Sequence, residues 1–248
     1  MNTLDYKYVN HEYEGFVLEP TVEEVPFRHW SEHLRTFWGW HEKEPNFAIS
    51  KTDLPSVKQT VSKGLFDAGY TDFANEVMGC SSGKAVSNTV VHQYTEETTL
   101  YSTVNSLLRS VHAGENIRKH SLSPWILQLN SALREQNTVD HTVYRGAKMK
   151  TSDIAEYTEG RLFHWASFVS TSRCREKAVA IGTNVLFEIE PWGSVSMYGK
   201  RNPYDVSALS AYPEEEEAVF PIACTFRVQK ISRTSELTEI RVRSIDHY

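Results

Sequence analysis

Apolar residues recur at helical spacing through much of the first half of the chain. One amphipathic helix is predicted from the face formed by Leu100, Val104, Leu107, Leu108 and Val111. Another is predicted to start at Ser123-Pro124, where the serine hydroxyl can cap the first turn and the proline can occupy it. Further helices are predicted at about 22–38, 55–68 and 84–95.

The pattern changes near residue 140 to short β-type runs separated by turns. Several of these runs alternate apolar with polar residues, as half-buried strands do. The sequence therefore predicts an α+β fold, with a helical first half and a mostly antiparallel β second half. The predicted strands are Thr142–Tyr144, Trp165–Ser170, Val185–Glu190, Val206–Leu209, Ala218–Phe220, Thr225–Val228 and Ile240–Val242.

Length and charge narrow the class of protein. The 248 residues, 40% of them hydrophobic, suffice for one sizeable core, or one core with a helical appendage. The net charge is −6, and no basic stripe interleaved with aromatics is visible, so no nucleic-acid partner is expected. No apolar run approaches the roughly 18 residues that a membrane segment needs, so none is predicted.

The N-terminal residues and the cysteines bear on where the protein works. Met1–Glu14 is polar and acidic, which predicts no secretory signal peptide. We expect a cytoplasmic enzyme or an effector delivered into another cell, and the sequence leaves both open. Cys80, Cys174 and Cys224 form no Cys-x-x-Cys pair, which is typical of a reducing compartment.

Three short elements of the second half carry candidate chemistry. They are Val143-Tyr144-Arg145-Gly146, Phe168-Val169-Ser170-Thr171-Ser172 and the run from Ser210 to Pro221 that contains four glutamates. Each alone is typical of a turn or a solvated loop. Taken together, the three motifs differ from ordinary turns and solvated loops, because the glutamate run leads directly into an apolar strand. In an extended chain Glu215 and Glu217 would share a face, with Glu216 on the other. Such paired carboxylates can do acid–base work, and an arginine with hydroxyls can hold an anionic substrate.

This order of motifs resembles the arginine–serine–glutamate class of mono-ADP-ribosyltransferases, which includes vertebrate ecto-enzymes and bacterial toxins that modify arginine. The resemblance covers roughly residues 86–230, and Glu-x-Glu is its most specific part. It extends to Ala180–Ile189 and, in the helical half, to Tyr94-Thr95, Leu100-Tyr101, Asn105 and Arg109. It implies an ADP-ribosyltransferase-like fold, whose β core is two small sheets with an NAD cleft.

The resemblance also implies a division of the chain. Residues 1–80 resemble nothing in the family and are expected to form a helical extension of unknown role. Residues 81–248 are expected to form the catalytic domain. Its helical part would span 81–140 and its β core 141–248.

Roles for individual residues follow from the resemblance. Glu217 matches the catalytic glutamate, and Glu215 the first acid of Glu-x-Glu, which goes with arginine as the acceptor. Arg145 matches the arginine that contacts the NAD⁺ phosphates, and Ser170 the serine that orients the catalytic glutamate. Gly146, Thr171 and Ser172 complete the expected NAD⁺-binding set. The loop at about 202–214 resembles the one that recognises the target protein, with Tyr212, or less favourably Tyr204, as its aromatic contact.

The implied function is transfer of ADP-ribose from NAD⁺ to arginine side chains of a target protein. An NAD⁺ glycohydrolase, in which water replaces arginine, would use the same residues, and a catalytically silent binding module is a third hypothesis. No metal is expected, although His29-Trp30-Ser31-Glu32-His33 spells a zinc-peptidase pattern without an evident third ligand. The sequence departs from the family where Arg173–Ala180 lacks an aromatic, where Ile181 replaces Phe, and at Pro221–Cys224.

Overall fold

The computed structural model describes residues 17–18, 53–110, 120–165, 167–179, 183–192, 202–222 and 224–245. It divides into two compact units. The helical unit contains the described residues 53–110 and 120–136, together with Leu209–Ala211, and the sheet unit contains the remainder. The helix predicted at 22–38 and the His29–His33 motif lie outside the described residues.

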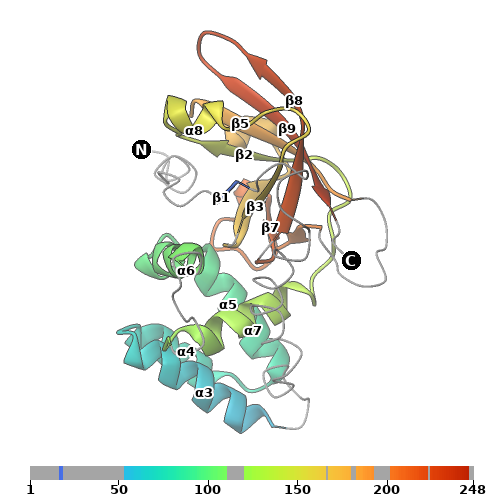
Figure 1. Ribbon diagram of the computed structural model, residues 1–248. Coiled ribbons are helices and arrows are strands. Elements are labelled where there is room, and N and C mark those ends of the chain that lie inside the picture. Colours follow the sequence, from blue (N-terminus) through green and yellow to red (C-terminus); the bar gives the residue numbers. More distant parts are fainter. Residues whose placement is uncertain are drawn as a thin grey trace. The chain divides into compact units, whose positions relative to one another are not determined.

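The helical unit is built around one buried helix. Its helices, shown from blue to green in Figure 1, are α3 (Leu54–Asp67), α4 (Thr71–Gly79), α5 (Gly83–Thr95), α6 (Thr99–Ser110) and α7 (Ser123–Leu133). Trp125, Ile126 and Leu129 on α7 are fully buried, and α3 and α5 both pack against this helix. The indole N–H of Trp125 donates to Gln93 Oε1 at 2.9 Å, which satisfies a polar group inside an apolar core.

The periodicity located most of these helices within a residue or two. The predictions at 55–68, at 84–95, around Leu100–Val111 and from Ser123 are confirmed by α3, α5, α6 and α7. Pro124 occupies the first turn of α7, as predicted, but the predicted serine cap is wrong, because the N-cap residue is Leu122 and it makes no side-chain cap bond. Helix α4 was not predicted.

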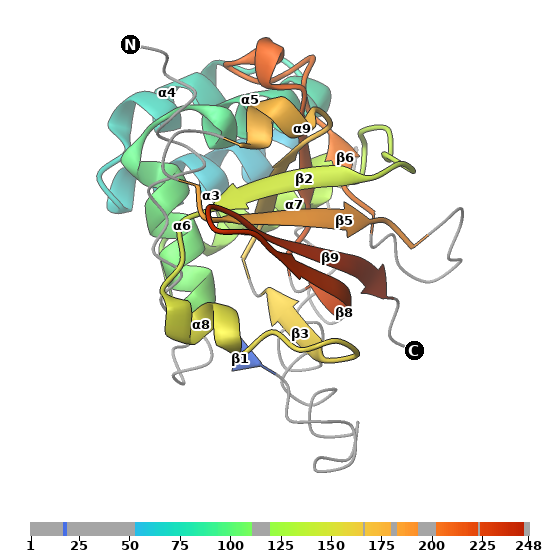
Figure 2. The ribbon, with the colours of Figure 1, turned by 90° about the horizontal axis from the view of Figure 1, so that it is seen from above.

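The sheet unit contains, among the described residues, nine strands in one hydrogen-bonded order, β1-β3-β8-β9-β5-β2-β4-β7-β6. Neighbours are antiparallel except for the parallel pair β5–β9. Figure 2 shows β2, β5 and β9 side by side. The strands are β1 (Val17–Leu18), β2 (Val143–Ala147), β3 (Leu162–Trp165), β4 (Val169–Ser172), β5 (Val185–Glu190), β6 (Tyr204–Asp205), β7 (Glu217–Phe220), β8 (Cys224–Arg233) and β9 (Thr238–Ile245). Short helices are α8 (Thr151–Ala155), α9 (Arg175–Ala178) and the 3₁₀ helix η3 (Pro213–Glu215).

Strand alternation produces the core of this unit. On β9, Ile240 and Val242 are fully buried, whereas Arg241 and Arg243 between and beyond them are exposed. The buried side chains gather around an aromatic cluster in which the rings of Trp165 and Phe226 lie 4.7 Å apart. The α+β fold with a mostly antiparallel β half is therefore confirmed.

The structure refines the prediction of two sheets. All nine strands are connected, but β2 and β4 share a single register pair, Tyr144 with Ser172. The strand order therefore divides into a large part, from β1 to β2, and a small part, β4-β7-β6. The single register pair between β2 and β4 joins them. The strand predicted as Trp165–Ser170 is two strands, because Trp165 on β3 pairs with β8 and Ser170 on β4 pairs with β7.

The strand predicted at Val206–Leu209 is wrong. Strand β6 ends at Asp205, and a turn follows. The Asp205 carboxylate accepts from the backbone N–H of Ser207 at 3.0 Å and from its hydroxyl at 2.6 Å. Such side-chain bonds two residues ahead compete with strand pairing and explain why the strand stops.

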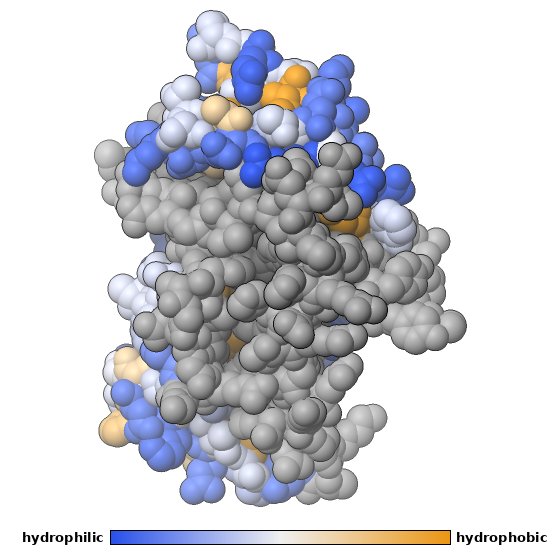
Figure 3. All heavy atoms as spheres, viewed as in Figure 1, coloured by the Kyte–Doolittle hydropathy of each residue, from blue (hydrophilic) through white to orange (hydrophobic). Residues whose placement is uncertain are grey.

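On the face drawn in Figure 3, most of the coloured surface is hydrophilic. Within the described ranges, no helix is both long enough and apolar enough to cross a bilayer. The large hydrophobic side chains exposed there are Phe66, Met78, Val179 and Trp192.

Gly64 tests the packing of α3 in the helical unit. A Cβ at Gly64 would lie 2.2 Å from the carbonyl oxygen of Ser121, so Gly64→Ala should destabilise the chain by about 1–3 kcal/mol. Gly79→Ala is the matched control: a Cβ there meets nothing within 4 Å, and the exchange should be neutral or add up to about 1 kcal/mol. Urea unfolding measures both, and equal stabilities for the two variants would contradict this packing.

Candidate active site

The three motifs singled out in the sequence lie on three adjacent strands. Arg145 is on β2, Ser170 on the neighbouring β4, and Glu217 begins β7, which follows β4 in the sheet. All three are at least 95% buried. The guanidinium of Arg145 donates from Nη1 to the carbonyl oxygen of Ser170 at 2.5 Å. Ser172 pairs with Glu217 across β4 and β7. The junction of β2, β4 and β7 therefore gathers the arginine, the hydroxyl motif and the glutamate.

The Ser-Thr-Ser motif holds the glutamate run by its backbone. The hydroxyl of Thr171 donates to the carbonyl oxygen of Ala218 at 2.6 Å, and that of Ser172 to the carbonyl oxygen of Glu215 at 2.7 Å. Ser172 Oγ also accepts from the backbone N–H of Cys174 at 3.0 Å. These hydroxyls thus act within the protein, and the NAD⁺ contacts expected for Thr171 and Ser172 stay predictions.

The carbonyl oxygens of residues 214–218 all accept hydrogen bonds. Their donors are, in order, Lys177 Nζ, Ser172 Oγ, Arg173 N, Val206 N and Thr171 Oγ1. Four of these donors come from the short segment Thr171–Lys177, which includes the end of β4 and the start of α9. A buried carbonyl without a donor would be costly, so this segment specifies the path of the glutamate run.

The glutamate run is not extended, which corrects the premise used in the sequence analysis. Pro213–Glu215 forms η3, and Glu216 has φ 50° and ψ 45°, the left-handed conformation. Glu215 and Glu217 are nevertheless both buried, at 1% and 0% exposed. Glu216 is partly exposed and pairs with Lys177 Nζ at 2.7 Å. A tight turn, not strand alternation, separates Glu216 from the other two.

Two cations from the segment after β4 lie against this turn. Lys177 hydrogen-bonds the Glu216 carboxylate, and this bond, then the Lys177 charge, lowers the pKa of Glu216, with a smaller contribution from Arg173. The Arg173 guanidinium pairs with Asp205 Oδ2 at 3.0 Å and donates to Ser207 Oγ at 3.3 Å. Lys177 and Arg173 therefore supply positive charge next to the run of four glutamates.

Gly146 has a steric role in the structure. A Cβ there would lie 1.9 Å from the carbonyl oxygen of Ala178, so only glycine lets the end of α9 approach β2 this closely. Its expected contact with NAD⁺ stays a prediction. A loss of function in a Gly146 variant would therefore not separate binding from packing.

The predicted recognition loop is held at its centre within the helical unit. His92 Nδ1 lies 2.9 Å from the carbonyl oxygen of Leu209, and Thr95 Oγ1 accepts from the backbone N–H of Ala211 at 2.9 Å. Tyr212 follows directly and is half-buried, so its role as the aromatic contact stays a prediction. Tyr204 is fully buried and is not exposed to a target protein.

No group of three or more His, Cys, Asp or Glu side chains within the described ranges is arranged to hold a metal ion. Cys80, Cys174 and Cys224 are free thiols. The described residues at this junction include buried carboxylates, hydroxyls and a guanidinium.

Comparison with known proteins identifies the family. The sequence profile of the ADP-ribosyltransferase exoenzyme family matches residues 80–245. The chain belongs to this family. The resemblance stated from Glu-x-Glu, Ser-Thr-Ser and Arg145 is thereby confirmed. ADP-ribosyltransferases use NAD⁺ as their co-substrate.

Individual relatives agree with this assignment. A Vibrio splendidus (strain 12B01) protein, provisionally named NAD(+)–arginine ADP-ribosyltransferase Vis, is 29% identical over 161 residues, which are 58% of this chain and 59% of that relative. The match thus spans less than two thirds of the relative's length. ADP-ribosyltransferase HopU1 of Pseudomonas syringae pv. tomato DC3000 aligns with a TM-score of 0.56 and 24% identity, over 77% of this chain and 87% of HopU1. A truncated type III effector XopAI from Xanthomonas axonopodis pv. citri aligns at 0.58 and 17%, over 88% and 99%. These two structures show the shared fold.

Sequence reasoning missed Arg173, Lys177 and Asp205. Charge balance was the signal that could have found them. Four consecutive glutamates that lead into an apolar strand need nearby cations. The segment Arg173-Cys174-Arg175-Glu176-Lys177, which directly follows the hydroxyl motif, contains three. Spacing could not show which of these cations meets the run, because the pairing spans 39 residues.

The charge state of Glu216 gives a pH prediction. Pairing lowers the pKa of Glu216 in the folded chain, so the pair stabilises the fold above the ordinary carboxylate range, and this stabilisation is lost as the pH falls through the lowered pKa. Wild type should therefore melt higher than Glu216→Gln near pH 7, and the difference should shrink towards about pH 3. Glu236→Gln, at an exposed position, is the control. A difference independent of pH would show that the charge of Glu216 does not contribute.

Proposed function

We propose that this chain transfers ADP-ribose from NAD⁺ to arginine side chains of a target protein and releases nicotinamide. The observation that carries the proposal is the burial of Glu217 at the start of β7, paired in register with Ser172, in a chain of the ADP-ribosyltransferase exoenzyme family. The name of Vis, which specifies arginine, and the presence of Glu215 two residues before Glu217 support arginine as the acceptor.

The proposed role of Glu217 is electrostatic. Breaking the bond between nicotinamide and ribose builds positive charge on the sugar, as in glycoside cleavage. A carboxylate fixed beside that charge stabilises the transition state more than the ground state. Burial strengthens the effect, because water screens a buried charge less. Ser170, on the neighbouring strand, is proposed to help orient this glutamate.

Glu215 is proposed to act on the acceptor. A free arginine side chain is protonated in water, and it is a poor nucleophile until an anion binds it or a base accepts its proton. The side chain of Glu215 is buried, and its backbone is fixed by the bond from Ser172, so the carboxylate is held in a defined place. Tyr212, at the start of η3, is proposed as the contact with the target protein.

Arg145 is proposed to bind the NAD⁺ phosphates. Its guanidinium is buried and oriented by the bond to the Ser170 carbonyl, and a planar fork of donors suits phosphate oxygens better than an ammonium does. Gly146 is proposed to let the dinucleotide approach the end of β2.

The direct test incubates the purified chain with labelled NAD⁺ and a cell lysate, and locates modified residues by mass spectrometry. ADP-ribose on arginine supports the proposal. Nicotinamide release without any modified protein or arginine analogue would favour an NAD⁺ glycohydrolase instead. Failure of calorimetry to detect NAD⁺ binding would favour a silent binding module.

Glu217→Gln should reduce both protein modification and nicotinamide release by at least about 100-fold, because it removes the charge while keeping the shape. The melting temperature should stay close to that of wild type. Glu236→Gln is the matched exchange at an exposed glutamate and should leave both rates unchanged. Wild-type turnover by the Glu217 variant would assign the chemistry to another residue.

Glu215→Gln should reduce transfer to arginine by at least about tenfold more than it reduces NAD⁺ hydrolysis, since its proposed partner is the acceptor. Agmatine, a small guanidine, serves as the acceptor in one assay, and water serves in the other. Equal losses in the two assays would remove the role of Glu215 in acceptor recognition.

A further inference from the structure

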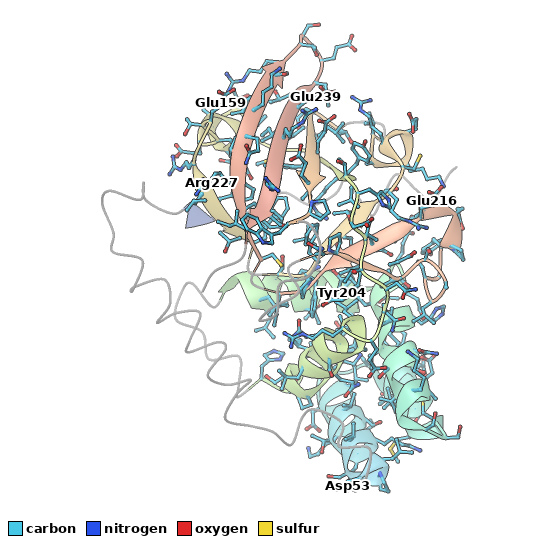
Figure 4. The ribbon with its side chains drawn as sticks, turned by 90° about the vertical axis from the view of Figure 1, so that its right-hand side faces the viewer. Asp53, Glu159, Tyr204, Glu216, Arg227 and Glu239 are labelled. Carbon is cyan, nitrogen blue, oxygen red and sulfur yellow. The ribbon has the colours of Figure 1, made fainter. Side chains whose placement is uncertain are left out.

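The residue immediately before Glu217 adopts a backbone conformation that amino acids with a side chain rarely take. Glu216 has φ 50°, and among the residues that the structure describes it is the one non-glycine residue with a positive φ. Glycine would take this conformation without a steric penalty, yet a glutamate stands there. Figure 4 labels Glu216 where η3 meets β7. Strain at such a site persists only when surrounding contacts maintain it.

Lys177 supplies two of those contacts. Its ammonium lies 2.7 Å from Glu216 Oε1 and also donates to the carbonyl oxygen of Glu214. One side chain on α9 therefore holds both ends of the left-handed turn. The backbone N–H of Arg173 donates to the carbonyl oxygen of Glu216 at 3.1 Å, which fixes the peptide that leads into Glu217.

Asp205 and Arg173 form a second ion pair next to the same turn. Arg173 pairs with Asp205 at 3.0 Å, and Asp205 on β6 lies in register with Ala218 on β7, one residue after Glu217. Arg173 and Lys177, the two cations next to the turn, thus come from the same short segment of the chain. Lys177 therefore bonds to the turn itself, whereas Arg173 pairs with Asp205 on the adjoining strand β6.

We propose that Lys177 and Glu216 are positioning residues that hold the left-handed turn and thereby aim the carboxylates of Glu215 and Glu217. The proposal rests on the proposed function of those two glutamates. Neither Lys177 nor Glu216 is proposed to touch the reacting atoms. Without Lys177 the turn keeps the bonds from Ser172 and Arg173 but loses those to the Glu216 carboxylate and the Glu214 carbonyl oxygen. This loss weakens the left-handed conformation and redirects the two carboxylates.

The relevant alternative gives Lys177 a direct role. An ammonium close to the hydroxyl motif could instead contact the NAD⁺ phosphates, which would make it a binding residue. The two roles predict different kinetics. A positioning residue lowers kcat and leaves NAD⁺ affinity almost unchanged, whereas a phosphate contact weakens NAD⁺ binding.

The test measures NAD⁺ affinity by calorimetry, nicotinamide release at saturating NAD⁺, and the melting temperature. Lys177→Met should lower kcat about 10- to 100-fold, with the NAD⁺ Kd within about twofold of wild type. Lys177→Arg keeps a cation and a donor, and should stay within about threefold of wild type. Lys84→Met, which removes an exposed lysine in the helical unit, is the matched control and should change nothing.

Restoring kcat with a second substitution distinguishes a positioning role of Lys177 from other causes of lost activity. Adding Glu216→Gly to Lys177→Met should restore kcat by at least about threefold, because glycine takes a positive φ without help from an ion pair. If Lys177→Met melts below the assay temperature, Glu216→Met provides the same test. It roughly keeps the size of the side chain, removes both the charge and the hydrogen-bond acceptor, and should lower kcat with NAD⁺ affinity unchanged.

Several results would overturn the inference. These are wild-type kcat in Lys177→Met or Glu216→Met, a weakened NAD⁺ Kd with unchanged kcat, or no rescue by glycine. A wild-type chain that releases no nicotinamide and modifies no arginine overturns the proposed function itself. An active wild type with a fully active Lys177→Met overturns only the positioning role.

Discussion

The carbonyl oxygens of residues 214–218 each accept a hydrogen bond, and four of the five donors belong to Thr171–Lys177. A run of four glutamates is ordinarily a mobile, solvated loop, because adjacent carboxylates repel one another and their backbone bonds to water. Here the backbone of the run is held to the end of β4 and the start of α9. This set of bonds determines the path of the backbone at Glu215 and Glu217.

This arrangement accounts for the sequence of the hydroxyl motif. Thr171 and Ser172 each direct a hydroxyl at a backbone carbonyl of the opposite segment, and alanine or valine would lose these hydrogen bonds. Ser170 instead offers its carbonyl to Arg145 on the opposite side of β4. Three successive residues thus connect β2, β4 and β7. That connection matters because the backbone pairing between β2 and β4 is limited to one register pair.

The sequence predicted the helical half, the β half and the order of the motifs because these depend on local periodicity and on adjacent residues. It also predicted that Arg145, Ser170 and Glu217 would come together, although that step came from resemblance and not from spacing. The turn at Glu216 could not be predicted, because glutamate has no preference for a positive φ and contacts from a distant segment maintain it. The break between β3 and β4 was missed for a similar reason: no glycine or proline marks it between Trp165 and Ser170, and the two strands pair with different partners.

The location of β9 constrains how the protein is made. This strand is the last described element in the chain, yet it lies in the interior of the sheet, between β8 and β5, and its parallel pairing with β5 joins residues about 53 positions apart. While the ribosome is still adding the preceding residues, β5 presents an unpaired edge, which is where nascent chains associate wrongly. Folding of the sheet unit must therefore wait until synthesis has passed residue 245. A nascent chain stopped before Thr238 would expose the edges of both β5 and β8 to chaperones and proteases.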